Sequence, residues 1–332
     1  MASKIRIGLV GYGNIGKGAA KAVTAAPDME LKAIFTRRNP ESMVAADSSI
    51  SDSGALLLPL ADAGKMVNDI DVMMLCGGSA TDLPEQAPQI ASMFNTVDSF
   101  DTHAKIPEYM ASIDAVAKNT TAIISTGWDP GLFSMMRILF ESTLPGGAAH
   151  TFWGEGLSQG HTNAVRRIEG VKYAAQYTIP IEDAVRAARR GEGAELGAYD
   201  KHIRECFVVA EPGADTAKIE ETIKTMPNYF AGYKTIVNFI DDDEFLKNHT
   251  KMPHGGMVIH SGTTGEGLHK NTMEFSLKLD SNPEFTASIM TSYARAVFRM
   301  SQEGLFGAKT VYDVPLSYLT AESREGLIKR LL

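Results

Sequence analysis

Two aspartates, Asp101 and Asp129, stand out as side chains that could do chemistry. Each follows a short apolar segment typical of a buried β-strand, so both are expected at the rim of a sheet. Two carboxylates at one rim suit a substrate with an ammonium group, because they match it in charge and in hydrogen bonding. Aspartates after strands are also common as helix N-caps or turn formers, and that interpretation stays open for both.

A second set of polar side chains further along the chain is rich in hydrogen-bond donors. Its members are Trp153, Ser158, Gln159, His161, Thr178, Arg204 and His254. Arg204 lies in a segment with a strand pattern, where burying a guanidinium without a carboxylate partner is costly. A carboxyl group of the substrate is therefore a reasonable partner for it. His254 lies in a glycine-rich loop that a ligand can approach closely, although an isolated histidine is more often structural.

The start of the chain indicates a cofactor site, because the apolar run Ile5–Val10 leads into G-x-G-x-x-G at Gly11, Gly13 and Gly16. A strand, a glycine turn and a helix, here over residues 17–26, are the context that dinucleotide binding requires. The glycines permit a tight turn, close approach of a pyrophosphate, and packing of the helix on the strand. The helix N-terminus offers N–H groups and partial positive charge to the phosphates. A flavodoxin-like turn without a dinucleotide is the alternative.

The choice of dinucleotide depends on the residues after the second expected strand, residues 29–35. An acidic residue there binds the ribose 2′-hydroxyl of NAD, whereas an arginine accommodates the 2′-phosphate of NADP. This chain has no carboxylate there and carries Arg37 and Arg38. A guanidinium suits a phosphate group well, so the sequence favours NADP. Two solvated surface charges are the alternative.

The first part of the chain must position these residues, and its strands and helices alternate. The expected strands cover residues 5–10, 29–35, 69–76, 96–101 and 121–125, and the expected helices cover residues 17–26, 84–94 and 106–118. Residues 40–64 are expected to form a loop with some short strand. The alternation predicts an α/β domain with a Rossmann-type, doubly wound parallel sheet.

Beyond residue 131 the pattern changes to strands in succession. They are expected at residues 150–154, 173–179, 202–210, 233–240, 256–261 and 272–279, with helices at 132–144, 181–190 and 215–226. This order predicts an α+β substrate and dimerisation domain with an open, largely antiparallel sheet. Helices at 283–302 and 321–332 are expected to return to the first domain. The dinucleotide domain is therefore expected at residues 1–127 and 281–332, and the second domain at 128–280.

Composition excludes several classes of protein. The 332 residues carry a net charge of −8, which argues against a nucleic-acid partner. No segment approaches the roughly 18 apolar residues of a membrane span, and the first residues show no export signal. Cys76 and Cys206 have no metal-site spacing, and neither a Walker loop nor a G-x-S-x-G elbow occurs. We expect a cytoplasmic protein without a metal, a membrane or a nucleic acid as partner.

Several longer phrases resemble one known family. They are VGYGN at 10–14, FTRR at 35–38, GSATDLPEQ at 78–86, STGWDPG at 125–131, TFWGEGLSQGH at 151–161, TMPNYF at 225–230 and MPHGG at 252–256. Together they resemble meso-diaminopimelate dehydrogenase along nearly the whole chain, and the phrase at 151–161 is far more specific than the glycine pattern. The resemblance implies a homodimeric, NADP-dependent enzyme of lysine biosynthesis. Such an enzyme reversibly converts the D-centre of meso-2,6-diaminopimelate to L-2-amino-6-oxopimelate, with release of ammonia and NADPH.

The resemblance also implies two sets of site residues. Those expected to contact NADP are Gly11, Tyr12, Gly13, Asn14, Ile15, Thr36, Arg37, Arg38, Cys76, Gly77, Gly78, Ser79, Ser99, Phe100, Asp101, Thr126, Gly127, Trp128, Asp129 and Pro130. Those expected to contact diaminopimelate are Asp101, Asp129, Trp153, Gln159, Gly160, Thr178, Arg204, His254 and Asn282. Asp101 and Asp129 are the expected catalytic residues, which hold the reacting amine near the nicotinamide.

One position departs from the family pattern, since Asn163 stands where an aspartate is usual. An asparagine engages an ammonium group less strongly than a carboxylate does. The departure suggests relaxed specificity that admits simpler D-amino acids.

Two other functions stay open. The first is another two-domain NADP oxidoreductase of amino-acid metabolism, such as a dihydrodipicolinate-reductase-like or semialdehyde enzyme, but these lack the Trp-Asp-Pro-Gly and Phe-Trp-Gly phrases. The second is an NADP-binding sensor without turnover, against which the intact set Asp101, Asp129, Arg204 and His254 argues.

Overall fold

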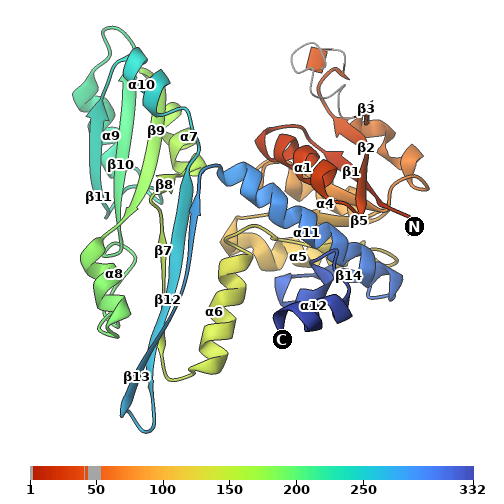
Figure 1. Cartoon of the computed structure of the whole chain (residues 1–332). Helices are drawn as coiled ribbons and strands as arrows, with labels where there is room; N and C mark the ends of the chain where they lie inside the picture. Colours follow the sequence, from red (N-terminus) through yellow and green to blue (C-terminus); the bar gives the residue numbers. More distant parts are fainter. Residues whose placement is uncertain (1–2, 41, 44–53) are drawn as a thin grey trace. The chain divides into compact units, whose positions relative to one another are not determined.

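The computed structural model of the chain describes residues 3–40, 42–43 and 54–332 (Figure 1). Two compact units are present, Met1–Met135 with Pro283–Leu332 (unit 1) and Met136–Asn282 (unit 2). The boundaries expected from the sequence lie near these, and the roles given to the two domains stay predictions. Within the described ranges, every helix is too short or too polar to cross a membrane.

Unit 1 is built on a seven-stranded parallel sheet with the order β14-β6-β5-β4-β1-β2-β3. The strands are β1 (Ile5–Val10), β2 (Met29–Thr36), β3 (Leu56–Pro59), β4 (Val72–Leu75), β5 (Asn95–Asp98), β6 (Thr121–Ile123) and β14 (Gly307–Lys309). All four residues of β4 are buried, as expected for a parallel strand covered on both faces. The Rossmann-type fold class is confirmed, and β14 is a strand that the sequence did not predict.

Helices and short 3-10 turns connect these strands. They are α1 (Asn14–Ala25), η1 (Leu60–Met66), α4 (Leu83–Ala91), η2 (His103–Lys105), α5 (Ile106–Asp114), α11 (Asn282–Gln302), η3 (Val311–Asp313), η4 (Leu316–Tyr318) and α12 (Arg324–Leu331). One buried cluster joins Phe35 and Met73 of the sheet to Leu83 of α4 and Ile113 of α5. Of the loop expected at 40–64, residues 41 and 44–53 lie outside the described residues.

The turn between β1 and α1 requires its glycines. Gly11 has a φ of +93°, a conformation that residues with a side chain rarely adopt. A methyl group at Gly16 would lie 2.3 Å from the carbonyl oxygen of Gly11. The helix can therefore begin directly after the strand only with glycine at both positions.

Unit 2 contains two sheets where the sequence pattern suggested one. The four-stranded sheet has the order β11-β10-β9-β8, and the three-stranded sheet has the order β13-β12-β7. Their strands are β7 (Ala148–Trp153), β8 (Gly156–Leu157), β9 (Val171–Pro180), β10 (His202–Ala210), β11 (Lys234–Phe239), β12 (His254–Thr264) and β13 (His269–Leu279). The pairing is largely antiparallel as expected, except that β10 and β11 are parallel.

The helices of the second part of the chain are α6 (Leu132–Thr143), α7 (Gln159–Arg166), α8 (Glu182–Arg189), α9 (Thr216–Thr225) and α10 (Asp242–Asn248). Helix α9 lies between β10 and β11 in the chain and supplies the crossover that their parallel pairing needs. Helices α7 and α10 were not predicted from the sequence, and α7 carries four residues of interest for the site, Gln159, Gly160, His161 and Asn163.

Candidate active site

The expected cofactor-binding segments of unit 1 lie at one edge of its sheet. They follow or end five adjacent strands, in the spatial order β6, β5, β4, β1 and β2. Because the strands are parallel, their carboxyl ends meet at the same edge, where open α/β sheets bind ligands. The structure thus brings together segments 126–130, 99–101, 76–79, 11–15 and 36–38.

The first turn of α1 fits a pyrophosphate. Its N-cap is Gly13, which forms no side-chain cap hydrogen bond, and a methyl group there would meet no atom within 4 Å. Backbone N–H groups at an open helix N-terminus are a ready site for a phosphate.

The end of β2 fits a 2′-phosphate. Arg37 and Arg38 are exposed, and Thr36 rather than a carboxylate ends the strand. Arg38 Nη2 donates to the backbone oxygen of Tyr12 at 2.9 Å, which ties this arginine to the glycine turn. Arg37 Nη2 donates to Asp82 Oδ1 at 2.5 Å, so an acidic side chain already compensates its charge. Arg38 is therefore the better placed of the two.

Asp101 and Asp129 lie on two neighbouring loops of that edge. We call residues 99–101 the β5 loop and residues 124–131 the β6 loop. Asp101 is exposed, and its N–H donates to Ser79 Oγ at 3.1 Å. The N-cap of η2 is Thr102, so Asp101 does not cap that turn. Asp129 is half-buried just before α6.

In unit 2, Arg204 and Thr178 occupy directly opposite positions of β10 and β9. Arg204 Nη1 donates to Thr178 Oγ1, and the guanidinium lies 4.3 Å from the centroid of the Tyr233 ring. The side chain is buried, which lowers its pKa, and Nε has no hydrogen-bond partner within the described part of the chain. A buried guanidinium with an unused donor is a site for an anion.

Two other residues of unit 2, Gly156 and Met252, provide contacts for His254, Gln159 and Asn282. Gly156 of β8 pairs with Thr178, and a methyl group at Gly156 would lie 2.4 Å from the Cα of His254. Met252 accepts two hydrogen bonds. Gln159 Nε2 donates to its sulfur at 3.3 Å, and the N–H of Asn282 donates to its carbonyl oxygen at 3.0 Å.

The remaining two expected residues lie at the ends of neighbouring elements. Trp153 ends β7 opposite Gly256 of β12, and Gly160 follows Gln159 in the first turn of α7. The structure therefore gathers the expected substrate residues of unit 2 around β8, β9 and β12.

Known proteins match the chain over its full length. A family model described as the diaminopimelic acid dehydrogenase C-terminal domain matches residues 127–281. The meso-diaminopimelate D-dehydrogenase of Lysinibacillus sphaericus is 57% identical over 332 residues, which are 99% of this chain and 100% of that protein. The chain belongs to the meso-diaminopimelate dehydrogenase family.

Further relatives agree with this placement. The meso-diaminopimelate D-dehydrogenase of Corynebacterium glutamicum is 47% identical, with 99% of each chain covered. The solved structure of C. glutamicum DAP dehydrogenase in complex with DAP has a TM-score of 0.91 at 46% identity, with both chains fully covered. An engineered D-amino acid dehydrogenase bound to NADP+ has a TM-score of 0.86 at 45% identity, and the match covers 99% of this chain and 100% of that one.

His202 is a residue of this family member that sequence reasoning missed. Its Nε2 accepts the backbone N–H of Trp153 at 2.8 Å, and the two rings stack with centroids 5.4 Å apart. Burial, followed by the charge of Arg204, lowers its pKa to about 4, so the ring is neutral near pH 7. Side chains along β10 alternate between the two faces of the sheet, so His202 and Arg204 lie on the same, buried face. This alternation in the sequence could have identified His202 as a neighbour of Arg204.

His161 has a similar environment. Its Nδ1 lies 2.7 Å from Ser158 Oγ, and its ring contacts Tyr229 edge-on with centroids 5.3 Å apart. Burial, followed by the charge of Arg204, lowers the pKa of His161 to about 4. Ser158 and His161, two of the donors noted in the sequence, thus form one hydrogen-bonded pair at the start of α7.

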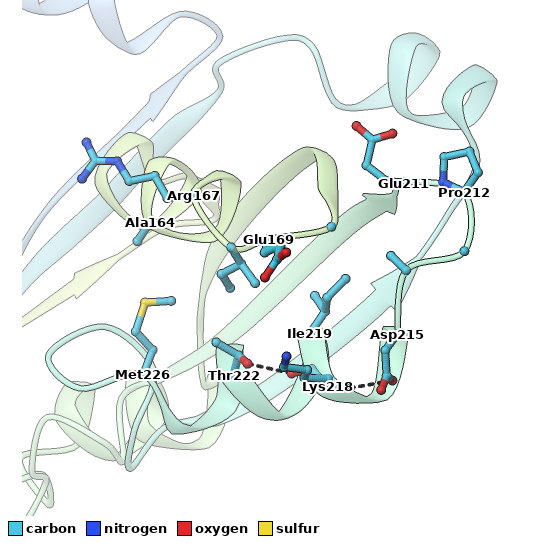
Figure 2. Close-up of a pocket in the computed structure, with 14 residues that line it drawn as sticks. Ala164, Arg167, Glu169, Glu211, Pro212, Asp215, Lys218, Ile219, Thr222 and Met226 are labelled. Atoms are coloured by element: carbon cyan, nitrogen blue, oxygen red, sulfur yellow. Dashed lines mark hydrogen bonds between the residues drawn. The ribbon is translucent and has the colours of Figure 1, made fainter.

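A separate cavity of about 880 Å³ lies between the end of α7, helix α9 and residues 211–215 (Figure 2). None of the residues expected to bind NADP or substrate lines it. Among the residues that the structure describes, no group of three His, Cys, Asp or Glu side chains is placed to hold a metal ion.

Proposed function

We propose that this chain is an NADP-dependent enzyme that oxidatively deaminates the D-centre of meso-2,6-diaminopimelate. The products are L-2-amino-6-oxopimelate, ammonia and NADPH, and the reverse reaction serves lysine biosynthesis. The observation that carries the substrate class is Arg204, a buried guanidinium that has an unused donor and no described carboxylate partner. Relatives of the same name over the full chain length support the reaction.

The proposed roles follow from charge. Asp101 and Asp129 hold the reacting ammonium group by charge and hydrogen bonding. Arg204 and Thr178 bind a carboxylate of the substrate, with His254 beside them. Burial lowers the pKa of His254, so its ring stays neutral and adds a hydrogen-bonding group rather than a charge.

The chemistry itself is simple once the substrate is oriented. NADP, when bound, supplies the hydride acceptor for the hydrogen on the D-centre. The residues of this chain orient that centre and hold its amine. The ammonium group loses a proton to solvent and the D-centre loses hydride to the cofactor, which leaves an iminium that water hydrolyses to the ketone and an ammonium ion.

We further propose that specificity is relaxed at the distal, L-configured end of the substrate. Asn163 is exposed on α7 and lies one helical turn after Gln159, so both side chains share one face of the helix. An amide at this position attracts an ammonium group less than the usual carboxylate. Asn163→Asp should therefore raise the ratio of kcat/KM for meso-diaminopimelate to that for D-lysine, and no activity of the wild type on D-lysine or D-alanine would contradict the proposal.

We infer a cytoplasmic homodimer that associates through unit 2. Large apolar side chains are exposed there, with Ile138 and Leu139 of α6 at 49% and 51% and Leu268 of the β12–β13 hairpin at 80%. Thr143 of α6 contacts the sulfur of Met273 of β13 at 3.5 Å, so these exposed residues belong to adjoining elements. Apolar surface of this kind favours association. Both cysteines are free and buried, which suits a reducing compartment.

The test is NADPH formation from NADP and meso-diaminopimelate, beside L,L-diaminopimelate, D-lysine, D-alanine and NAD. Activity on the meso isomer with NADP supports the proposal. NADP binding without turnover on any of these substrates would favour the sensor instead. Light scattering at several protein concentrations tests the dimer, and a monomer mass throughout would contradict it.

A further inference from the structure

The side chain of Asp98, at the end of β5, joins the β5 loop to the β6 loop. Its Oδ1 accepts the backbone N–H of Phe100 at 2.9 Å and that of Ser125 at 3.0 Å. Its Oδ2 accepts the hydroxyl of Tyr109 at 2.8 Å. One carboxylate therefore holds a residue next to Asp101 and a residue in the loop that carries Asp129.

The backbone of Asp98 strengthens the same connection. Its carbonyl oxygen accepts the N–H of Thr126 at 2.9 Å and the hydroxyl of Thr126 at 2.8 Å. Ser125, between β6 and Thr126, has a φ of +58°, which is unfavourable for a residue with a side chain. Asp98 thus binds this residue and the next one, where the β6 loop departs from ordinary strand geometry.

The burial of the Asp98 carboxylate requires an explanation. Asp98 is 1% exposed, and no lysine, arginine or histidine of the described residues pairs with it. Burial of such a charge is costly, but only an ionised carboxylate accepts all three of these hydrogen bonds without donating one. Tyr109, on α5, is the one titratable group that contacts it within the described chain, and burial, followed by the charge of Asp98, raises the pKa of that phenol.

The phenol also braces the β5 loop directly. The ring of Tyr109 stacks on that of Phe100, with centroids 4.0 Å apart. Asp98, Phe100 and Tyr109 therefore contact one another pairwise, which leaves the residue before Asp101 little freedom.

We propose that Asp98 is a positioning residue for the reaction, because its carboxylate sets the separation of Asp101 and Asp129 around the reacting amine. This role rests on the proposed function, in which those two aspartates hold the amine. Asp98 itself does not touch the substrate.

The role has a pH signature. Burial raises the pKa of Asp98 to about 6, against the opposing hydrogen bonds from Phe100, Ser125 and Tyr109. Below this pH the carboxyl group gains a proton and loses its charge, so the hydrogen bonds that it accepts from the N–H groups of Phe100 and Ser125 become weaker. The link between the two loops is then weaker, so kcat/KM should decline on the acid side.

Three variants test the role. Asp98→Asn keeps the shape but replaces the charged acceptor with a neutral amide, which weakens the hydrogen bonds from Phe100 and Ser125, and it should lower kcat/KM for meso-diaminopimelate about 10-fold. The Kd for NADP should stay within about threefold, because the glycine turn and Arg38 are untouched. Tyr109→Phe keeps the ring stacking but removes a hydrogen bond that lowers the pKa of Asp98, so the acid limb should move up by roughly half a unit to one unit.

The matched control is Asp71→Asn. Asp71 binds Arg6 at the amino end of the same sheet, with 2.7 Å between Oδ1 and Nη2, so its loss costs stability away from the loops. It should keep the wild-type kcat/KM and the wild-type acid limb. If Asp98→Asn does not fold, the position of the acid limb in Tyr109→Phe decides.

The outcomes separate the two proposals. Wild type that binds NADP but shows no turnover overturns the proposed function, and the role of Asp98 with it. Active wild type, combined with Asp98→Asn and Tyr109→Phe variants that behave as Asp71→Asn does, overturns the role of Asp98 alone.

Discussion

Arg204 donates a hydrogen bond to Thr178 across two paired strands, and this bond uses only one of its nitrogen atoms, Nη1. An arginine side chain carries five donor hydrogens, and the Nε of Arg204 has no partner among the described residues. The aromatic ring of Tyr233 lies 4.3 Å from the guanidinium and stabilises its charge, but it supplies no carboxylate to pair with it. The pair is thus arranged to receive an anion from outside the chain.

Arg204→Lys should raise KM for meso-diaminopimelate and lower kcat/KM by about 100-fold, since a lysine cannot bind a carboxylate through two parallel hydrogen bonds. Steady-state kinetics measure this, with the Kd for NADP as a second readout that should not change. Arg186→Lys, at an exposed ion pair of α8, is the control. A KM within threefold of wild type would rule out substrate binding by Arg204.

Asp129→Ala should lower kcat/KM for meso-diaminopimelate by about two or more orders of magnitude, because the reacting amine loses an orienting carboxylate. NADP binding should persist, which equilibrium titration of the cofactor can verify. Asp62→Ala, on η1, serves as the control and should match wild type. Unchanged kinetics of Asp129→Ala would refute its assignment.

Arg38→Ala should raise KM for NADP by roughly 10-fold to 100-fold, since a charge-assisted contact to the 2′-phosphate is lost. KM for NAD should hardly change, because NAD lacks that phosphate. Arg37→Ala should have the smaller effect, since Asp82 already pairs with Arg37. An equal rise of KM for both cofactors would mean that Arg38 supports the fold and does not select NADP.

His202 should make the protein sensitive to acid. Its folded pKa of about 4 lies below the ordinary value of 6.5, so the unfolded chain binds a proton more readily and stability is lost as pH falls between these values. The loss should reach roughly 2 kcal/mol near pH 5. His202→Gln keeps an acceptor but cannot titrate, so urea unfolding at neutral and acid pH should show a smaller loss for this variant. Equal losses for both proteins would exclude His202 as the cause.

Local signals in the sequence were enough for most of the fold. The glycine pattern predicted β1, the turn and α1, and β10 was predicted with the bounds it has in the structure. Helix α7 was missed because its sequence, QGHTNAVR, contains a glycine and β-branched residues and buries only Thr162 and Val165. Strand β14 has three residues and exists through its pairing with β6, which no local pattern reveals.

The residues of the site could also be predicted only in part from the sequence. The family phrases supplied the residues expected to touch NADP and substrate, and the structure gathers them at the sheet edge of unit 1 and around β8, β9 and β12 of unit 2. Asp98 and Asp101 looked alike in the sequence, as two carboxylates near the end of one strand. Only burial separates them, and the partners of Asp98 come from positions 100, 109 and 125.

The discontinuity of unit 1 has a consequence for how the chain is made. Asp28, after α1, forms an ion pair with Arg295 of α11, with 2.7 Å between Oδ1 and Nη2. Strand β14 pairs with β6 and is the outermost strand on that side of the sheet. A ribosome therefore synthesises both sheets of unit 2 before the residues that complete unit 1. All strands of unit 2 are thus synthesised before the last strand of unit 1. The seven-stranded sheet of unit 1 can be completed only near the end of synthesis.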